Sequence, residues 1–266
     1  MELFKIPKDI NNVLIHTDIM GGIKFPLKDK KSFLDLHFNF LKDYIGNSNI
    51  YIPSFNYNCL KTGIFNVETD PIQVGVLNEY IREKKKFERN KVPVFSFLSS
   101  SSIKNDNIED NKIIDPFGDE SLFHDLYKKN SFLLHYGSNF RTSTIIHYIE
   151  RTSKKLLYRY DKFFHIDIVS NDITNKIILK YHVRPVGFNL EYDWLKLEKE
   201  LTDSGILFKY NSGRTKLLGI KISDLVDFWI EKLNDDPLYL LRSDTRSSVE
   251  SKLDKFGRGF KLNDFE

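Results

Sequence analysis

Apolar residues in the first half of the chain form short runs that alternate with longer segments of helical spacing. Four runs are typical of buried strands, at residues 13–15, 49–53, 93–98 and 132–134. Apolar positions three or four residues apart predict intervening helices at residues 32–45, 76–81 and 119–129. This alternation is typical of a three-layer α/β/α fold with a mostly parallel central sheet.

The second half of the chain changes to the alternating pattern of antiparallel strands. One predicted pair is 163–169 with 176–183 about the turn Asn171-Asp172, and another is 206–210 with 216–222 about Ser212-Gly213. Two amphipathic helices are also expected, over residues 192–201 and after Ser223 as N-cap. We expect these strands to extend the central sheet. Because no repeat is visible, we expect residues 1–266 to form a single domain.

The segment from Phe132 to Glu150 combines all of these signals. Its apolar strand ends at Gly137, and the N-cap candidates Thr142, Ser143 and Thr144 precede a helical pattern. The loop would lie at the carboxyl end of the strand, where open α/β sheets bind ligands. His147 and Glu150 are three positions apart and share one helix face, so the carboxylate can orient a proton acceptor. Such pairs are also common on surface helices, so the spacing alone does not establish catalysis.

Composition narrows the classes of partner. The chain has 41% hydrophobic and 29% charged residues, which is ordinary for a globular protein. Its net charge is +3, and its densest basic run, residues 82–91, also contains two Glu. This pattern does not predict a nucleic-acid interface. No apolar run reaches the ~18 residues of a membrane span, and the N-terminus MELFKIPKD lacks an apolar signal segment. We therefore expect a cytoplasmic protein with no membrane partner.

Cysteine and histidine spacing gives no sign of a metal site. The single cysteine, Cys59, cannot form an intramolecular disulfide, and no base lies at a recognisable spacing to make it a nucleophile. The histidines do not form a zinc pattern with it. We expect no metal cofactor.

Several blocks in order resemble the aminoglycoside 3-N-acetyltransferase family, whose members use acyl-CoA. VLIHTDI (13–19) resembles its strand with His-Ser-Ser-Leu, and IPSFNY (52–57) its Pro-Thr-Phe segment. RNKVPVFSF (89–97) resembles its Arg-Ser-x-His-Pro-x-x-Ser block, and FGDES (117–121) its Gly-x-x-Ser. GSNFRTSTIIHYIE (137–150) resembles its Thr-x-x-His-x-x-Glu block, and YRYDKFF (158–164) its Tyr-Arg-x-x-Lys. The resemblance covers nearly the whole chain.

The chain departs from the family pattern at three positions. Asp18 stands where the second Ser of His-Ser-Ser-Leu would be, Asn90 follows Arg89 in place of Ser, and Val92 replaces His. The family uses these neighbourhoods for CoA and for the acceptor. The departures therefore bear on which acceptor is used.

The resemblance implies transfer of an acyl group from acyl-CoA, as co-substrate, to an amine. An ammonium is not a nucleophile, so a base is needed; His147 stands at the family position, with Glu150 to orient and stabilise it. Backbone N–H groups at Thr17 to Ile19 would stabilise the oxyanion. The residues expected to bind CoA are His16, Thr17, Asp18, Ile19, Arg89 and Ser96.

The expected acceptor pocket offers few acids. Its residues are Phe55, Asn56, Tyr57, Asn139, Arg141 and Thr144. Hydrogen-bonding groups, a cation and aromatic faces suit an amino sugar linked to a nucleotide, as used for surface polysaccharides (O-antigen or capsule), better than a polycation. The alternatives are an enzyme that inactivates aminoglycoside antibiotics and a catalytically silent binding protein of the same fold.

Overall fold

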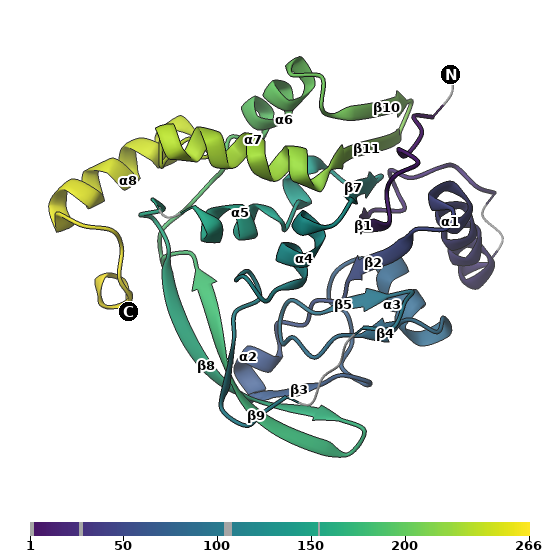
Figure 1. Ribbon diagram of the computed structural model, residues 1–266, viewed down its shortest axis with the longest axis horizontal. Coiled ribbons are helices and arrows are strands. Elements are labelled where there is room, and N and C mark those ends of the chain that lie inside the picture. The colour runs from purple at the N-terminus through teal and green to yellow at the C-terminus, as the bar shows by residue number, and fades with distance from the viewer. Residues whose placement is uncertain (1–2, 27–28, 104–107, 154) are drawn as a thin grey trace.

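In the computed structural model, which describes residues 3–26, 29–103, 108–153 and 155–266, a central sheet organises the chain (Figure 1). Within these residues, seven strands form it in the order β10-β11-β7-β1-β2-β5-β4. Their bounds are Asn12–Thr17 (β1), Asn49–Pro53 (β2), Glu88–Arg89 (β4), Phe97–Ser99 (β5), Ser131–Tyr136 (β7), Phe208–Ser212 (β10) and Thr215–Lys221 (β11). The pairings make β10, β7, β1, β2 and β4 run in one direction and only β11 and β5 in the other. The expected mostly parallel sheet is confirmed.

Helices cover both faces of this sheet. Val13 and Ile15 of β1 pack in one apolar cluster with α1 (Lys30–Ile45) and α3 (Val76–Lys84). Leu14 faces the opposite side, in a second cluster with α4 (Leu122–Lys128), α5 (Ile146–Thr152) and α7 (Ile222–Asp235). Alternate side chains of a strand point to opposite faces, so the continuous apolar run in β1 reflects burial on both sides. The three-layer α/β/α prediction is confirmed.

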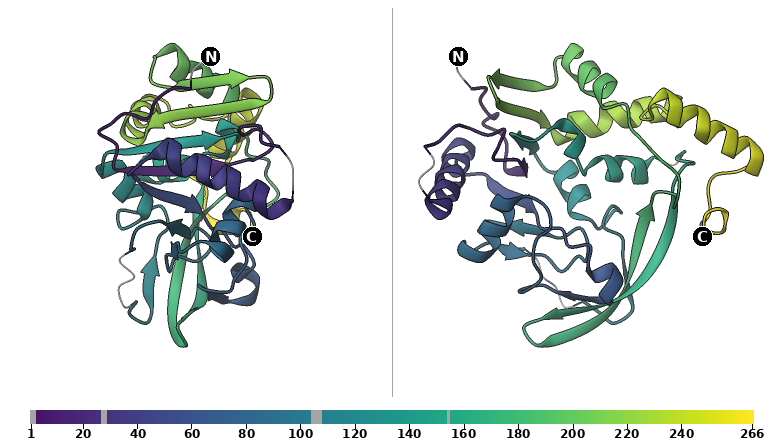
Figure 2. Two further views of the ribbon diagram at one scale, coloured as in Figure 1. Left: turned by 90° about the vertical axis from the view of Figure 1, so that its right-hand side faces the viewer. Right: turned by 180° about the vertical axis from the view of Figure 1, so that it is seen from behind.

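The long hairpin of β8 (Tyr160–Ser170) and β9 (Ile173–Val183) belongs to a different sheet. It pairs with β3 (Ile64–Asn66) and β6 (Lys112–Ile114) in the order β3-β8-β9-β6, and it curves away below the central sheet (Figures 1 and 2). Asn171 and Asp172 turn the chain with φ of 49° and 63°, as the sequence predicted. Of the two predicted strand pairs, only β10–β11 extends the central sheet.

The remaining elements connect and border these layers. They are α2 (Cys59–Thr62), α6 (Trp194–Asp203), α8 (Ser243–Phe256) and the short 3-10 helices η1 (Phe140–Thr142) and η2 (Leu262–Asp264). The tail after Pro237 contributes to the core, since Val249 and Phe260 are buried in a third apolar cluster. Glu266 accepts a hydrogen bond from Tyr160 at 3.0 Å, which brings the chain's end to the start of β8.

Three local predictions failed. Ser223 lies inside α7 and does not cap it, because the helix begins at Ile222. No side chain caps α5 either, and Ser143 donates to the carbonyl of Phe140 at 2.6 Å instead. The predicted strand 93–98 is reduced to Phe97–Ser99, because Val94 has a φ of 66°, which lies outside the β region.

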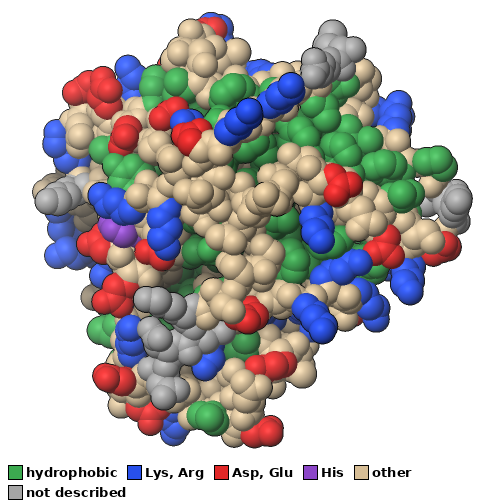
Figure 3. Space-filling view, turned by 45° about the vertical axis from the view of Figure 1, so that its right-hand side comes forward, with side chains coloured by type: hydrophobic (Ala, Val, Ile, Leu, Met, Phe, Trp, Pro, Cys, Tyr) green, Lys and Arg blue, Asp and Glu red, His purple; other side chains and the backbone are tan. Residues whose placement is uncertain are grey.

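Apolar residues of the two sheets share one cluster, in which Leu14 of β1 packs with Ile166 of β8 and Ile177 of β9. The single domain over residues 1–266 stays a prediction. In the described ranges, no helix combines the length and apolarity needed to cross a membrane. On the face shown in Figure 3, Lys and Arg side chains are mixed with Asp and Glu and form no single positive stripe.

Candidate active site

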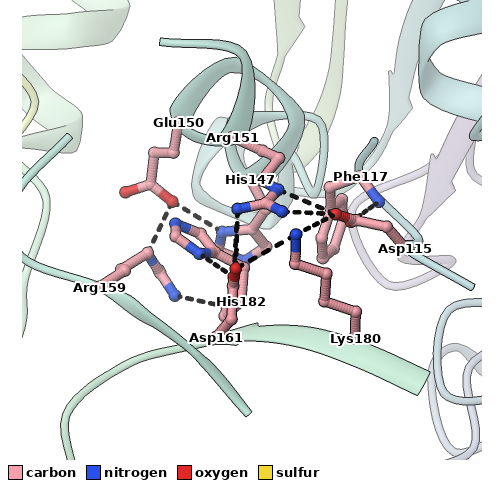
Figure 4. A network of polar contacts seen from close by, with 9 residues as sticks. All are labelled: Asp115, Phe117, His147, Glu150, Arg151, Arg159, Asp161, Lys180 and His182. Atoms are coloured by element: carbon pink, nitrogen blue, oxygen red, sulfur yellow. Dashed lines mark hydrogen bonds and ion pairs between the residues drawn. The ribbon is translucent and has the colours of Figure 1, made fainter. Parts of the chain in front are cut away.

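The His147–Glu150 pair forms as its spacing predicts. Both residues lie in α5, and His147 Nδ1 is 3.1 Å from Glu150 Oε2 (Figure 4). The side chain of His147 is 26% exposed, whereas that of Glu150 is fully buried. Because an ionised carboxylate only accepts hydrogen bonds, Nδ1 carries the proton and the lone pair of a neutral imidazole is on Nε2.

Glu150 is held by partners that come from outside its helix. Arg159 Nε lies 2.8 Å from Oε2, while the hydroxyls of Tyr158 and Tyr192 donate to Oε1 at 3.0 and 2.7 Å. Burial by itself would raise the pKa of Glu150, but Arg159 and His147 outweigh it and lower the pKa to about 2. The carboxylate is therefore ionised at any working pH.

The basicity of His147 reflects opposing neighbours. Burial and then the Arg159 guanidinium lower its pKa below the ordinary 6.5, while the contact with Glu150 raises it. The net lowering keeps the imidazole neutral near pH 7. A neutral imidazole with a fixed tautomer can accept a proton.

His147 lines a cavity of about 410 Å³ between α5, the start of α6 and the β8–β9 hairpin. Its other walls include polar and aromatic side chains of both halves of the chain: Tyr57, Arg141, Thr142, Thr144, Arg159, Tyr181, His182, Arg184, Glu191, Tyr192 and Trp194. Three arginines and two histidines thus face one carboxylate, Glu191, across this space.

A second cavity, of about 640 Å³, lies at the carboxyl end of β1. It is lined by His16, Thr17, Asp18 and Ile19, with Phe55 and Asn139 also contributing to its wall. The two cavities share Tyr57, Arg141, Thr142 and Thr144. They therefore adjoin beside His147.

The strand end at His16 is more closed than the sequence suggested. His16 stacks on His135 with ring centroids 5.2 Å apart, and burial lowers the pKa of His16 to about 4. The N–H of Asp18 already donates to the carbonyl of Tyr136 at 2.8 Å. The expectation that this N–H would stabilise an oxyanion is corrected, since a donor bound within the sheet end is not free for substrate.

Arg89 and Ser96 also have a different place from the one expected. Both are buried, and Arg89 donates to Ser96 Oγ at 3.0 Å, to the carbonyl of Asp70 at 2.6 Å and to that of Ser54 at 2.5 Å. Neither lines either cavity beside His147. The expectation that they bind CoA phosphates is corrected, because protein carbonyls and hydroxyls already occupy their donors.

Asn56 does not lie in the acceptor pocket where it was expected. Its side chain donates to the carbonyl of Pro71 at 2.9 Å and accepts from the N–H of Asn58 at 2.9 Å, so it stabilises the turn into α2. Asn56 is 1% exposed and lines neither cavity. The other five residues expected in the acceptor pocket, namely Phe55, Tyr57, Asn139, Arg141 and Thr144, line one or both cavities.

Several groups at the site were not predicted from the sequence. His182 lies on β9, and Arg159 and Arg184 flank the two ends of the hairpin. Tyr192 lies just before α6, and Trp194 is its first residue. One signal was available for His182. Equal steps back along both strands from the turn Asn171-Asp172 bring His182 opposite Asp161, which is the observed register.

Metal-binding chemistry has no candidate in the part of the chain that the structure describes. No group of three or more His, Cys, Asp or Glu residues there is arranged to hold a metal ion. Cys59 is buried, and burial raises the pKa of its thiol.

Comparison with known proteins identifies the family. A family model described as aminoglycoside 3-N-acetyltransferase matches residues 46–234, which is well over half of the chain. The chain belongs to the aminoglycoside 3-N-acetyltransferase family. No curated protein sequence matches it. The match includes both residues of the His147–Glu150 pair, which the sequence assigned to this family's motif.

Several solved structures share the fold. AAC-IIIb in its binary complex with CoASH has a TM-score of 0.67 at 16% identity, covering 85% of this chain and 90% of its own. Sisomicin-bound AAC-VIa has a TM-score of 0.65 at 15% identity, covering 84% and 91%. The YokD protein of Bacillus subtilis has a TM-score of 0.62 at 15% identity, covering 86% and 88%.

The family settles the general chemistry. This member is an acyl-CoA-dependent N-acyltransferase, and acyl-CoA is its co-substrate. The residues that line the two cavities bear on the identity of the acceptor.

Proposed function

We propose that this enzyme transfers an acetyl group from acetyl-CoA to an amine of an aminoglycoside-type amino sugar, with His147 as general base. The observation that carries this proposal is the pair in α5. Glu150 holds Nδ1 of His147, whose side chain lines the cavity, and Nε2 of His147 has no protein partner among the described residues. The family model and the sisomicin complex of a structural relative support the acceptor class.

The two adjoining cavities suit the two substrates. We assign the pantetheine arm and thioester to the cavity at His16 and Thr17, and the acceptor to the cavity at His147 and Tyr192. The thioester carbonyl would then lie near the shared residues Tyr57 and Thr144. Proximity of two bound reactants replaces a bimolecular encounter and lowers the barrier.

His147 and Glu150 would divide the work of proton transfer. The free amine attacks the thioester carbon, and His147 Nε2 accepts the proton that the nitrogen loses as the C–N bond forms. Glu150 stabilises the resulting imidazolium, as the carboxylate of a triad does. The C–S bond then breaks, and the imidazolium returns the proton to the departing sulfur, giving CoA.

A second acceptor class is favoured by one observation. Arg141 and Arg184 line the acceptor cavity without an ion pair or hydrogen bond in the described residues, and Glu191 is its single carboxylate. Unpaired guanidinium groups bind phosphate well and repel a polycation. An amino sugar linked to a nucleotide, of the kind used in surface polysaccharides, is therefore the second candidate.

A panel of acceptors tests both candidates. CoA release is measured from acetyl-CoA with sisomicin, with kanamycin and with a nucleotide-linked amino sugar. Turnover of the aminoglycosides supports the first candidate, and turnover of the nucleotide-linked sugar alone supports the second. Arg184→Glu sharpens the choice, because the new carboxylate should favour the polycation and lower kcat/KM for the phosphate-bearing acceptor by about tenfold or more. Absence of turnover with every amine would contradict the proposed function.

A further inference from the structure

A second histidine–carboxylate pair lies at the same cavity as His147. His182 on β9 faces Asp161 on β8 directly across the hairpin, and His182 Nδ1 is 3.1 Å from Asp161 Oδ1 (Figure 4). The His182 residue is 8% exposed and lines the cavity, and its Nε2 has no hydrogen-bond partner among the described residues. A buried ring nitrogen without a partner is costly unless a ligand or water satisfies it.

Asp161 is fixed so that it can orient this imidazole. Arg151 Nη1 donates to its two oxygens at 3.1 and 3.2 Å, and Lys180 Nζ lies 3.3 Å from Oδ2. Burial would raise the pKa of Asp161, but the contacts with His182 and Arg151 lower it to about 2. An ionised Asp161 accepts the Nδ1 proton of His182, so the lone pair of the neutral ring is on Nε2.

Acylation of an ammonium removes two protons from its nitrogen, and one imidazole nitrogen accepts only one proton at a time. An acceptor amine arrives mostly as R–NH₃⁺ at neutral pH, and the amide product R–NH–CO–R′ retains one of these three protons. One of the other two leaves on the sulfur of CoA, and the remaining one goes to solvent. If His147 carries the proton that moves from nitrogen to sulfur, an acceptor that binds as the ammonium needs another group to take the proton that leaves before attack.

We propose that His182 is a second base, which accepts the first proton of the bound ammonium at Nε2, keeps it while the amine attacks and then passes it to water. The bond broken is N–H of the ammonium and the bond formed is N–H of the imidazole, so the amine becomes a nucleophile while His147 is still neutral. This inference rests on the proposed acylation of an amine and adds a residue to that same site.

The two imidazoles are close enough to influence each other. After burial and Arg159, His182 is among the groups that lower the pKa of His147. Arg159 Nη1 donates to the carbonyl of His182 at 3.4 Å, which ties β9 to the Glu150 cluster. The charged and titratable groups around His182 are Asp161 on β8, Lys180 on β9, Arg159 just before β8, Arg184 just after β9, and His147 and Arg151 on α5.

The pH profile of His182→Gln tests this role. Without the second base, only acceptor that is already free amine can react, so kcat/KM should fall about tenfold for each pH unit below the amine pKa. The deficit against the wild type should be about 10²-fold two units below that pKa and should vanish above it. Asp161→Asn should show the same pattern with a smaller deficit. A merely structural role would lower activity equally at all pH values, and that result would overturn the proposal.

His165→Gln is the matched control, because His165 is an exposed histidine of β8 on the same hairpin. Its pH profile should equal that of the wild type, and thermal unfolding of all three variants checks that the hairpin stays folded.

A second measurement does not depend on turnover. In NMR spectra of histidine-labelled protein, the His182 signal is assigned by its loss in His182→Gln, and sisomicin, or the nucleotide-linked amino sugar, is then added. A shift of this signal supports contact of the amine with His182, and a shift without any turnover would overturn the proposed function alone. An unchanged His182 signal on saturation with an acceptor that is turned over would overturn the second base.

Discussion

The two histidine–carboxylate pairs at the cavity have equal lengths and unequal surroundings. In both, Nδ1 lies 3.1 Å from a carboxylate oxygen. The His147 pair lies within α5 and its carboxylate is fully buried, whereas the His182 pair joins two strands and the side chain of Asp161 is 26% exposed. The carboxylate is therefore enclosed in the helix pair and partly open to solvent in the hairpin pair, while the imidazole is more exposed in the helix pair.

Burial determines how many partners each carboxylate needs. Glu150 needs Arg159, Tyr158 and Tyr192 to compensate for its lost hydration, and these partners leave it one orientation. Asp161 has Arg151 and Lys180, which water can partly replace. We infer that the helix pair supplies a base of fixed geometry, and that the hairpin pair can exchange protons with solvent.

The largest expected effect is that of His147→Ala. Removal of a positioned general base should lower kcat by about 10²–10⁴-fold. Stabilisation of the protein against heat by acetyl-CoA should stay near the wild-type value, because the thioester is assigned to the other cavity. If this variant kept a near-normal kcat at saturating substrate, the general base would be another residue.

The two carboxylates should also differ in what they contribute to stability. Glu150→Gln leaves the Arg159 guanidinium buried without a counter-ion and should lower the free energy of unfolding by about 3–5 kcal/mol. Asp161→Asn should lower it by less than about 1 kcal/mol, since its ion pairs are partly exposed. Chemical denaturation of the two matched amide variants measures both values. Equal losses would show that burial does not distinguish the pairs.

The pKa of His147 provides a smaller test. Burial and the Arg159 guanidinium lower it, so the midpoint of an NMR titration of the His147 ring should lie below the ordinary 6.5. The base is then protonated, and its function lost, only as the pH falls below that value. In Glu150→Gln the midpoint should fall further, because Glu150 raises the pKa of His147 while Arg159 lowers it. A midpoint above 6.5 in the wild type would contradict the electrostatics of the cluster.

The two pairs differ in how far apart their residues lie along the sequence, and this decided which pair could be predicted. His147 and Glu150 were found because three residues along a helix fix their contact. His182 and Asp161 are 21 positions apart, and only the register of the hairpin brings them together.

Arg89 and Ser96 were misplaced for a related reason. Their partners Ser54 and Asp70 lie in other segments, and no local pattern shows that a donor is already occupied. The layers of the fold were predictable, because apolar periodicity reports burial directly.

The smallest effect concerns the turn that sets the hairpin register. Asn171 and Asp172 both have positive φ, of 49° and 63°, as a two-residue type I′ turn requires. Glycine adopts such a φ without the cost that a side chain imposes, although it also gains more freedom in the unfolded chain. Asp172→Gly should therefore raise the free energy of unfolding by at most about 1 kcal/mol.

The position of the turn makes this variant a clean control for the His182 pair. The turn closes the hairpin at Ser170 and Ile173, whereas Asp161 and His182 pair near its open end. Activity should therefore be unchanged at every pH. Asp167 lies in the middle of β8 and has no positive φ that glycine could relieve. Asp167→Gly should therefore destabilise the protein, because glycine weakens a strand interior. If Asp172→Gly destabilised the hairpin as much as Asp167→Gly, the Asp172 side chain would stabilise the turn by more than its positive φ costs.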